Sequence, residues 1–169
     1  MKTEVLVLGH LLTSKGLKPQ SNKVEAILNW QPPKNISELR SFLGAVGYYR
    51  QFIPNYSSMS EPLCRLLKKN AKFIWSSDQD LSFKFKFLKQ KLMESPVFTF
   101  PNFNKPFLIR WDDSYTELGG VLLQIEEETG MELPIHYISR SLNKAERHYS
   151  VTDLVLPCSI VFQNLSNTF

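Results

Sequence analysis

The stretch NISELRSFLGAVGYYR, residues 35–50, decides how the chain is interpreted, because it predicts a long amphipathic helix. Asn35 is followed three residues later by Glu38, which is the spacing of a capping box at the start of a helix. Apolar residues then return every three or four positions, at Leu39, Phe42, Leu43, Val46 and Tyr49. The pattern predicts a helix over residues 36–53 that Pro54 ends.

Three further helices are predicted around it. Apolar residues at helical spacing place them over residues 21–30, 59–69 and 76–94. Prolines follow the first and the last, and a proline ends a helix because it lacks an N–H and disfavours the helical conformation in the preceding residue. In the last helix the apolar stripe is Leu81, Phe85, Leu88 and Leu92. Phenylalanines that alternate with lysines over residues 83–87 also suit a strand, but the stripe and the strong helix formers favour a helix.

Strands are predicted on both sides of the helices. Residues 4–18 hold apolar runs around Gly9-His10 and around Ser14-Lys15-Gly16, which is typical of a β-hairpin with Gly16 in the turn. Later in the chain, three antiparallel strands are predicted over residues 107–112, 118–126 and 133–139.

The order of these elements predicts an α+β fold in two units. A β-hairpin and a helical bundle occupy residues 1–95, and a partial antiparallel sheet with a C-terminal helix occupies residues 96–169. That last helix is predicted over residues 149–162, where Pro157 kinks or breaks it. The two units are expected to meet near residues 95–106, where the stretch PNFNKP has the composition of a linker.

The composition is that of a folded protein. Of 169 residues, 43% are hydrophobic and 21% charged, with 7 glycines and 10 prolines, which excludes collagen-like, low-complexity and wholly disordered chains. Apolar runs fall far short of the ~20 residues that span a bilayer, and the N-terminus lacks the pattern of a signal peptide. Cys64 and Cys158 form no CxxC or Cys/His cluster, so neither a disulfide framework nor a zinc site is expected. We therefore expect an intracellular protein, cytoplasmic or nuclear, with no membrane partner.

The charge is divided unevenly along the chain. Residues 1–110 carry 17 basic and 7 acidic residues, a net charge of +10, whereas residues 111–169 carry 3 and 9, a net charge of −6. A basic surface attracts the phosphates of nucleic acids, and a carboxylate-rich surface attracts divalent metal ions. An ordinary solvated surface is the alternative explanation for both.

Several short sequence motifs occur in a fixed order along the chain. They are Leu8-Gly9-His10, Val24-Glu25-Ala26-Ile27, LRSFLG at 39–44 with GYYR at 47–50, Pro106-Phe107, GVLLQ at 120–124, and SRSL at 139–142 with ERHYS at 146–150. Together these motifs resemble the Pol polyprotein of gypsy-type long-terminal-repeat retrotransposons. The resemblance covers residues 8 to about 153. It implies that residues 1–95 correspond to the end of the reverse transcriptase palm, the thumb and the connecting region. Residues 96–169 then correspond to the start of a ribonuclease H domain.

The resemblance also implies that the polymerase centre is missing from this sequence. The family polymerises DNA with palm aspartates, typically in a Tyr-x-Asp-Asp turn that precedes a Phe-Leu-Gly-His segment. Here only a few residues precede Gly9, and no Tyr-x-Asp-Asp occurs. Such carboxylates hold two metal ions ~3.5–4 Å apart. We therefore expect that the chain does not polymerise DNA by itself.

By the same resemblance the ribonuclease H site is incomplete. Asp112, in the segment WDDS, takes the place of the family's first metal ligand. The second ligand is the later Glu of a Glu-x-Glu in the family, and the matching residues Asp153-Leu154-Val155 put a valine there. The two remaining aspartates would follow residue 169. We expect a degenerate metal site with Asp112 as a remnant, no cofactor and no hydrolysis in this chain, although the parent family uses Mg²⁺.

The helix predicted over residues 36–53 carries the candidate nucleic-acid contacts. Arg40, Gly44 and Tyr48 recur at i, i+4 and i+8 and so share one face, with Gly47 beside them. Two glycines in a helix cost roughly 1 kcal/mol each relative to alanine. In the family the matching thumb helix follows the minor groove of the primer–template duplex, where glycines permit close approach, the arginine supplies charge and the tyrosine packs on sugars or bases. Close helix–helix packing at both glycines is the alternative.

Gly9 and His10 are the second candidate contact. In the family the matching hairpin grips the primer strand, because a backbone without a side chain lets a phosphate approach. Val7 replaces the phenylalanine that usually precedes Leu-Gly-His in the family. Ordinary turn chemistry is the alternative for this pair.

From these residues we expect a retrotransposon Pol fragment that is catalytically inactive alone and binds an RNA–DNA hybrid or double-stranded nucleic acid weakly, without sequence preference. Two alternatives stay open. One is a domesticated structural or protein-interaction module. The other is a truncated gene model of an active RNA-directed DNA polymerase and ribonuclease H, whose partner would be the remainder of a Pol polyprotein.

Overall fold

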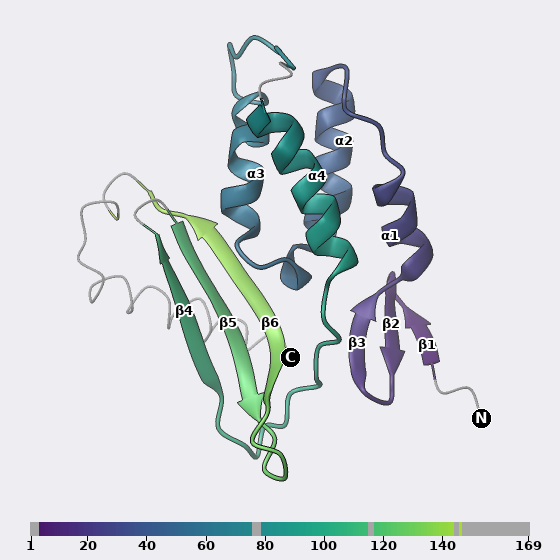
Figure 1. Cartoon of the computed structure of the whole chain (residues 1–169), viewed down its shortest axis with the longest axis vertical. Helices are drawn as coiled ribbons and strands as arrows, with labels where there is room; N and C mark the ends of the chain where they lie inside the picture. The colour runs from purple at the N-terminus through teal and green to yellow at the C-terminus, as the bar shows by residue number, and fades with distance from the viewer. Residues whose placement is uncertain (1–3, 76–78, 115–116, 144–145, 147–169) are drawn as a thin grey trace.

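The computed structural model describes residues 4–75, 79–114, 117–143 and 146, and the side chains of residues 79–83, 112–114 and 117 lie outside that description. In this part of the chain, two three-stranded sheets lie on one side of a group of helices (Figure 1). The α+β fold class predicted from the sequence is therefore confirmed.

The N-terminal sheet is an antiparallel meander of β1 (Glu4–Val7), β2 (His10–Thr13) and β3 (Gly16–Pro19). The predicted hairpin thus gains a third strand, because residues 4–18 hold two turns rather than one. The first turn has only two residues, Leu8 and Gly9, and both have positive φ, at 45° and 74°. Positive φ at both central residues is the geometry of the type I′ turn, which matches the twist of the strands it joins.

The helical group consists of four α-helices and one 3₁₀ turn in the described part of the chain. They are α1 (Ser21–Leu28), α2 (Ile36–Tyr48), η1 (Arg50–Phe52), α3 (Tyr56–Arg65) and α4 (Gln79–Met93). None of the helices in this part of the chain has the length and apolar character needed to cross a bilayer.

The N-terminus of α2 forms as the sequence predicts. The side-chain oxygen of Asn35 accepts a hydrogen bond from the backbone N–H of Glu38 at 2.9 Å. The Glu38 carboxylate returns to the start of the helix, where it accepts from the backbone N–H of Lys34 at 2.8 Å and from the Asn35 amide at 2.7 Å. The predicted capping box is therefore confirmed, with one difference: the Glu38 carboxylate accepts from the backbone N–H of Lys34 instead of that of the N-cap residue Asn35.

Several predicted helix ends are wrong. The helix predicted over 36–53 ends at Tyr48, because Tyr49 bonds back to Val46 three residues earlier and the chain continues as a 3₁₀ turn. The helix predicted over 59–69 begins at Tyr56 and ends at Arg65, since a left-handed Asn55 turns the chain into it. The helix predicted over 21–30 ends at Leu28.

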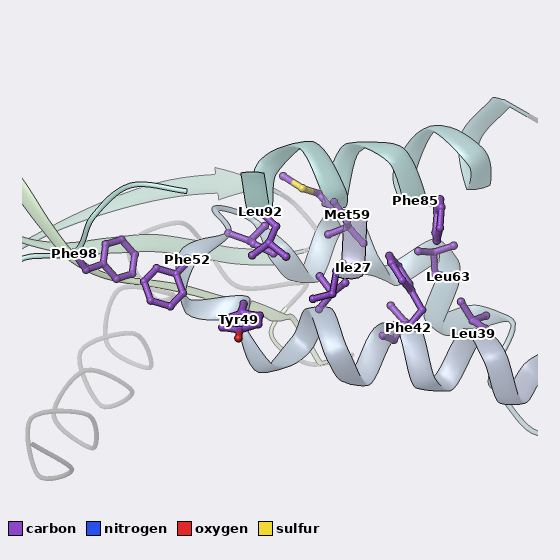
Figure 2. Close-up of a cluster of buried hydrophobic side chains, with 14 residues drawn as sticks. Ile27, Leu39, Phe42, Tyr49, Phe52, Met59, Leu63, Phe85, Leu92 and Phe98 are labelled. Atoms are coloured by element: carbon purple, nitrogen blue, oxygen red, sulfur yellow. The ribbon is translucent and has the colours of Figure 1, made fainter. Parts of the chain in front are cut away.

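The main core lies among the helices. Figure 2 shows its buried side chains, with Phe42 and Phe85 at one end, where their ring centroids are 4.4 Å apart. On α4 the predicted stripe is buried at Phe85, Leu88 and Leu92, whereas the side chain of Leu81 lies outside the described residues. At the other end Phe52 stacks on Phe98, with centroids 4.7 Å apart.

The second sheet is antiparallel, in the order β4 (Leu108–Ser114), β5 (Glu117–Ile125) and β6 (Glu132–Ser141). The three strands predicted in this region are therefore confirmed, with ends shifted by a few residues. On its central strand, Gly120 leaves room for the ring of Trp111, to which a Cβ at this position would come within 2.8 Å. The helix predicted over 149–162, together with Pro157, lies outside the described residues.

Phe98 joins the two sheets to the helices. Its backbone pairs with Leu17 of β3 through two hydrogen bonds of 2.7 and 2.8 Å, and its ring contacts Tyr137 of β6. A Cβ on Gly16 would lie 2.0 Å from the Phe98 carbonyl oxygen, so only glycine fits there. The segment near the predicted boundary is thus packed, and the division into units 1–95 and 96–169 stays a prediction.

Candidate nucleic-acid interface

One face of α2 is solvent-exposed and carries three of the predicted contact residues. Arg40 and Gly44 are exposed, and Tyr48 is 52% exposed. Among the described residues, and apart from its chain neighbours and the backbone of its own helix, no atom lies within 4 Å of the position that a Cβ on Gly44 would take. Helix packing therefore does not account for this glycine, and the face is open to an approaching partner over two helical turns.

Gly47 differs from Gly44. A Cβ at Gly47 would lie 3.1 Å from the hydroxyl of Tyr56, on the next helix. The helix-packing interpretation thus fits Gly47, which lets α2 and α3 approach, and does not fit Gly44.

The turn at Leu8 and Gly9 is attached to the C-terminal end of α2. The hydroxyl of Tyr48 donates to the carbonyl oxygen of Leu8, and the hydroxyl of Tyr49 donates to that of Gly9 at 2.9 Å. The Gly9 carbonyl also accepts from the backbone N–H of Gln20 at 3.2 Å. The structure therefore brings together Gly9 and Tyr48, which are 39 positions apart in the sequence.

Hydrogen bonding is what stabilises this turn. Leu8 is 84% exposed, so its side chain gains almost nothing from packing. A left-handed conformation costs a non-glycine residue about 1–2 kcal/mol. A neutral hydrogen bond contributes about 0.5–1.5 kcal/mol net, so the two tyrosine hydroxyls together offset that cost.

His10 lies beneath the same turn. Its Nδ1 is 3.0 Å from the Leu8 carbonyl oxygen, and its Nε2 is 3.2 Å from the amide nitrogen of Gln51. An amide nitrogen only donates, so Nε2 accepts, and Nδ1 carries the proton and donates to Leu8. The ring also contacts Tyr48, at 5.3 Å between centroids, and Phe52, at 5.7 Å. In this tautomer each ring nitrogen of His10 has a hydrogen-bond partner.

Tyr49 and Gln51 are functional candidates that the sequence did not reveal. They contact Gly9 and His10 across 40 and 41 positions, and no local periodicity reports such a contact. Burial, and to a lesser extent Tyr48, raises the pKa of the Tyr49 hydroxyl. The hydroxyl therefore stays protonated and donates at neutral pH.

A hollow of about 430 Å³ lies beside the turn, between α1 and α2. Its lining is mostly apolar, and Lys23 of α1 stands at it. The lining residues are Leu8, Gly9, Lys23, Ala26, Ile27, Trp30, Ala45, Tyr48 and Tyr49. The turn therefore has a hollow on one side instead of a packed core.

The predicted metal position can be placed only in part. Asp112 lies on β4, where its backbone is paired with Gly119 of β5, and its side chain lies outside the described residues, as does Val155. Among the residues that are described, no group of three or more His, Cys, Asp or Glu side chains is placed to hold a metal ion. A metal site at Asp112, degenerate or complete, stays a prediction.

An ion pair between Arg140 and Glu146 joins the SRSL and ERHYS motifs. Both terminal nitrogens of Arg140 donate to the carboxylate of Glu146 at 2.8 Å. Glu146 also accepts from the backbone N–H of Asn143, whose side-chain oxygen accepts from the Glu146 N–H, each at 2.9 Å. These bonds lower the pKa of Glu146 to about 2, so the carboxylate is charged at neutral pH.

Comparisons with known proteins show what this chain is similar to. A family model described as an RNase H-like domain found in reverse transcriptase matches residues 75–163. The Pol polyprotein of transposon 297 from Drosophila melanogaster is 39% identical over 155 residues, which are 90% of this chain and 14% of that protein. The Tf2-3 polyprotein of Schizosaccharomyces pombe is 36% identical over 152 residues, 90% of this chain and 11% of that protein. The chain thus spans a small part of the length of these relatives.

Solved structures share the fold. A foamy viral protease–reverse transcriptase in complex with double-stranded DNA superimposes with a TM-score of 0.80 at 21% identity, over 98% of this chain and 34% of that one. The same kind of protein in complex with an RNA/DNA hybrid gives 0.77 at 22% identity, over 96% of this chain and 22% of that one. The chain therefore belongs to the family of RNase H-like domains found in reverse transcriptase, and it matches a segment of retrotransposon Pol polyproteins.

Proposed function

We propose that this chain binds the backbone of a duplex, an RNA–DNA hybrid or double-stranded DNA, without sequence preference, as part of the reverse transcriptase of a retrotransposon Pol polyprotein. Arg40, Gly44 and Tyr48 of α2 and the Gly9-His10 turn make the contact, whereas Gly47 serves packing. The observation that carries the proposal is the open face at Gly44, next to a turn whose carbonyls are bonded to the same helix end.

Charge and fold support this assignment. The net charge of +10 over residues 1–110 favours a polyanion, and Arg40 on the exposed face supplies one cation at the surface itself. Tyr48 offers an aromatic ring beside it, which suits packing on sugars. The foamy viral proteins that share the fold were solved with double-stranded DNA and with an RNA/DNA hybrid.

Titration of a labelled RNA–DNA hybrid at several salt concentrations tests the proposal. Binding that depends on phosphates weakens as salt rises, and removing one contacting cation lowers the slope of log affinity against log salt by about 1. Arg40→Ala should produce that change. Lys15→Ala, which removes the same charge from the turn between β2 and β3, should not. Affinity that does not change with salt, or equal effects of the two variants, would show the assignment to be wrong.

We also propose that the 169-residue chain has neither polymerase nor ribonuclease H activity, and that it needs no metal cofactor of its own. No Tyr-x-Asp-Asp occurs in the sequence, and the side chain of Val155, which the resemblance aligns with the second ribonuclease H ligand, has no oxygen that could hold a metal ion. Purified protein is expected to leave an RNA–DNA hybrid intact in Mg²⁺ or Mn²⁺. Cleavage that Asp112→Asn abolishes would overturn this proposal, and cleavage that survives the change would come from a contaminant.

A protein-interaction module is the second candidate, and β1 is the observation that favours it. All four residues of β1 are exposed, among them Val5, Leu6 and Val7. Self-association measured by light scattering, and its loss in Leu6→Lys, tests this candidate.

An intracellular location, expected from the cysteine content, stays a proposal.

A further inference from the structure

The turn at Leu8 and Gly9 is attached to the helices mainly by side-chain hydrogen bonds. Both of its carbonyl oxygens accept hydrogen bonds from tyrosines of one helix end, and the imidazole that follows is bonded to Gln51 of η1. No side chain of the turn is packed into the core, and a hollow of about 430 Å³ adjoins it. The position of the turn relative to α2 therefore depends on these polar contacts, together with the contacts of the His10 ring with Tyr48, Tyr49 and Phe52.

The contributing residues divide into two groups. Tyr48 is exposed and belongs to the face that is proposed to contact nucleic acid. Tyr49 is buried, and its ring contacts His10 and Phe52 while its hydroxyl bonds Gly9. Gln51 is partly buried and contacts His10 through its amide. Tyr49 and Gln51 thus contact the turn from the buried side of the protein.

We propose that Tyr49 and Gln51 are positioning residues for duplex binding, which hold the Leu8–Gly9–His10 turn against the end of α2 so that turn and helix form one continuous surface. The inference rests on the proposed function, since it explains how two segments distant in sequence contact one duplex. A loose turn would have to be ordered on binding, and that ordering lowers affinity.

The test compares two double variants of the full chain. Tyr49→Phe with Gln51→Leu keeps the aromatic ring and a second side chain of similar volume, and it removes the hydrogen bonds that these two residues make to Gly9 and His10. Tyr56→Phe with Gln90→Leu makes the same two changes away from the turn, where it removes the bond from the part-buried Tyr56 hydroxyl to Leu43 and the exposed bond from the Gln90 amide to Glu94. The measured quantities are affinity for a labelled RNA–DNA hybrid, the thermal midpoint, and amide hydrogen exchange of residues 8–10.

The first variant is expected to bind the hybrid about tenfold more weakly, which is about 1.4 kcal/mol, and to exchange the amides of residues 8–10 faster. The control variant is expected to bind the hybrid within about twofold of the wild type, and the thermal midpoints show how much stability each double variant has lost. An unchanged affinity in the first variant, or an equal loss in both, would overturn the positioning role while leaving the proposed function intact. Wild-type protein that does not bind the hybrid at all would overturn both.

Discussion

At the level of single residues, Gly16 and Gly44 have different surroundings, so replacing each by alanine should change the stability of the protein in opposite directions. Gly16 has a φ of 137°, and a Cβ at this position would clash with the carbonyl oxygen of Phe98. Gly44, in contrast, lies in a regular helix with open space beside it. Gly16→Ala should lower the free energy of unfolding by roughly 3 kcal/mol, because strain and the lost pairing with Phe98 add together. Gly44→Ala should raise it by about 0.5–1 kcal/mol, since alanine is the better helix former.

Urea unfolding of the two variants measures both effects. Gly44→Ala also has a second expected outcome, because a methyl group on the open face hinders the approach of a sugar–phosphate backbone. It should bind the hybrid less tightly while being more stable than the wild type. A loss of stability in Gly44→Ala would contradict the open environment described for this residue.

His136 gives a pH dependence at the same scale. Burial, and to a lesser extent the charge of Arg50, lowers the pKa of His136 from 6.5 to about 4. The unfolded chain therefore takes up this proton first, so stability is fully present above pH 6.5 and falls as the pH drops towards 4. At about 1.4 kcal/mol per pKa unit, the loss is on the order of 3 kcal/mol.

The free energy of unfolding measured between pH 7 and pH 4 tests this prediction. His136→Gln removes the titrating group, so its curve should be flatter than that of the wild type in this range. Glu146, whose pKa is lowered from 4.5 to about 2, loses its contribution mainly below pH 4.5. It is present in both proteins, so its effect cancels in the comparison. Parallel curves for wild type and His136→Gln would show that His136 is not the responsible group.

At the scale of elements, the start of α2 depends on its cap. Asn35 accepts from the N–H of Glu38 and donates to its carboxylate. Asn35→Ala should therefore lower the free energy of unfolding by about 1 kcal/mol, and Asn29→Ala, at an exposed C-cap of α1, by much less. Chemical denaturation of the two variants is the measurement, and equal losses would contradict a specific role of the cap.

The elements that the sequence predicts well are those specified by neighbours in the chain. The capping box at 35–38 and the stripe at Phe85, Leu88 and Leu92 involve residues three to seven positions apart, and both are found. The end of α2 was predicted five residues too late, because the apolar pattern continues through Tyr49 into the 3₁₀ turn. A periodicity counts apolar residues and does not detect a change from α-helix to 3₁₀ turn.

The candidate site was predictable to a lesser degree. The shared face of Arg40, Gly44 and Tyr48 follows from helical spacing, and the structure shows it exposed. The attachment of the Leu8–Gly9 turn to Tyr48 and Tyr49 does not follow from any local rule, because it joins residues 40 positions apart. Nor does spacing distinguish the open Gly44 from the packed Gly47.

At the scale of the whole molecule, the segment before β4 has a packed part and an exposed part. Phe98 is 1% exposed and pairs with Leu17, whereas Phe103 is 60% exposed. Brief treatment with chymotrypsin should therefore cut after Phe103 and spare Phe98, because proteases cut exposed loops first. Mass spectrometry of the fragments identifies the cut. Equal cleavage at both would contradict this packing, and protection of all of residues 95–106 would contradict the predicted boundary between two units.

The pairing of Leu17 with Phe98 has a consequence during synthesis of the protein. The ribosome adds Phe98 about 80 residues after Leu17, which at roughly 5–20 residues per second takes about 4–16 seconds. During that interval β3 lacks its partner Phe98, which lies against Gly16 and pairs with Leu17. The unpaired strand edge of the N-terminal sheet can then form non-native hydrogen bonds with other strands. Slow translation of the helical region lengthens this exposure, so codon choice between residues 20 and 98 and the supply of chaperones should influence how much of the newly made chain reaches the native state.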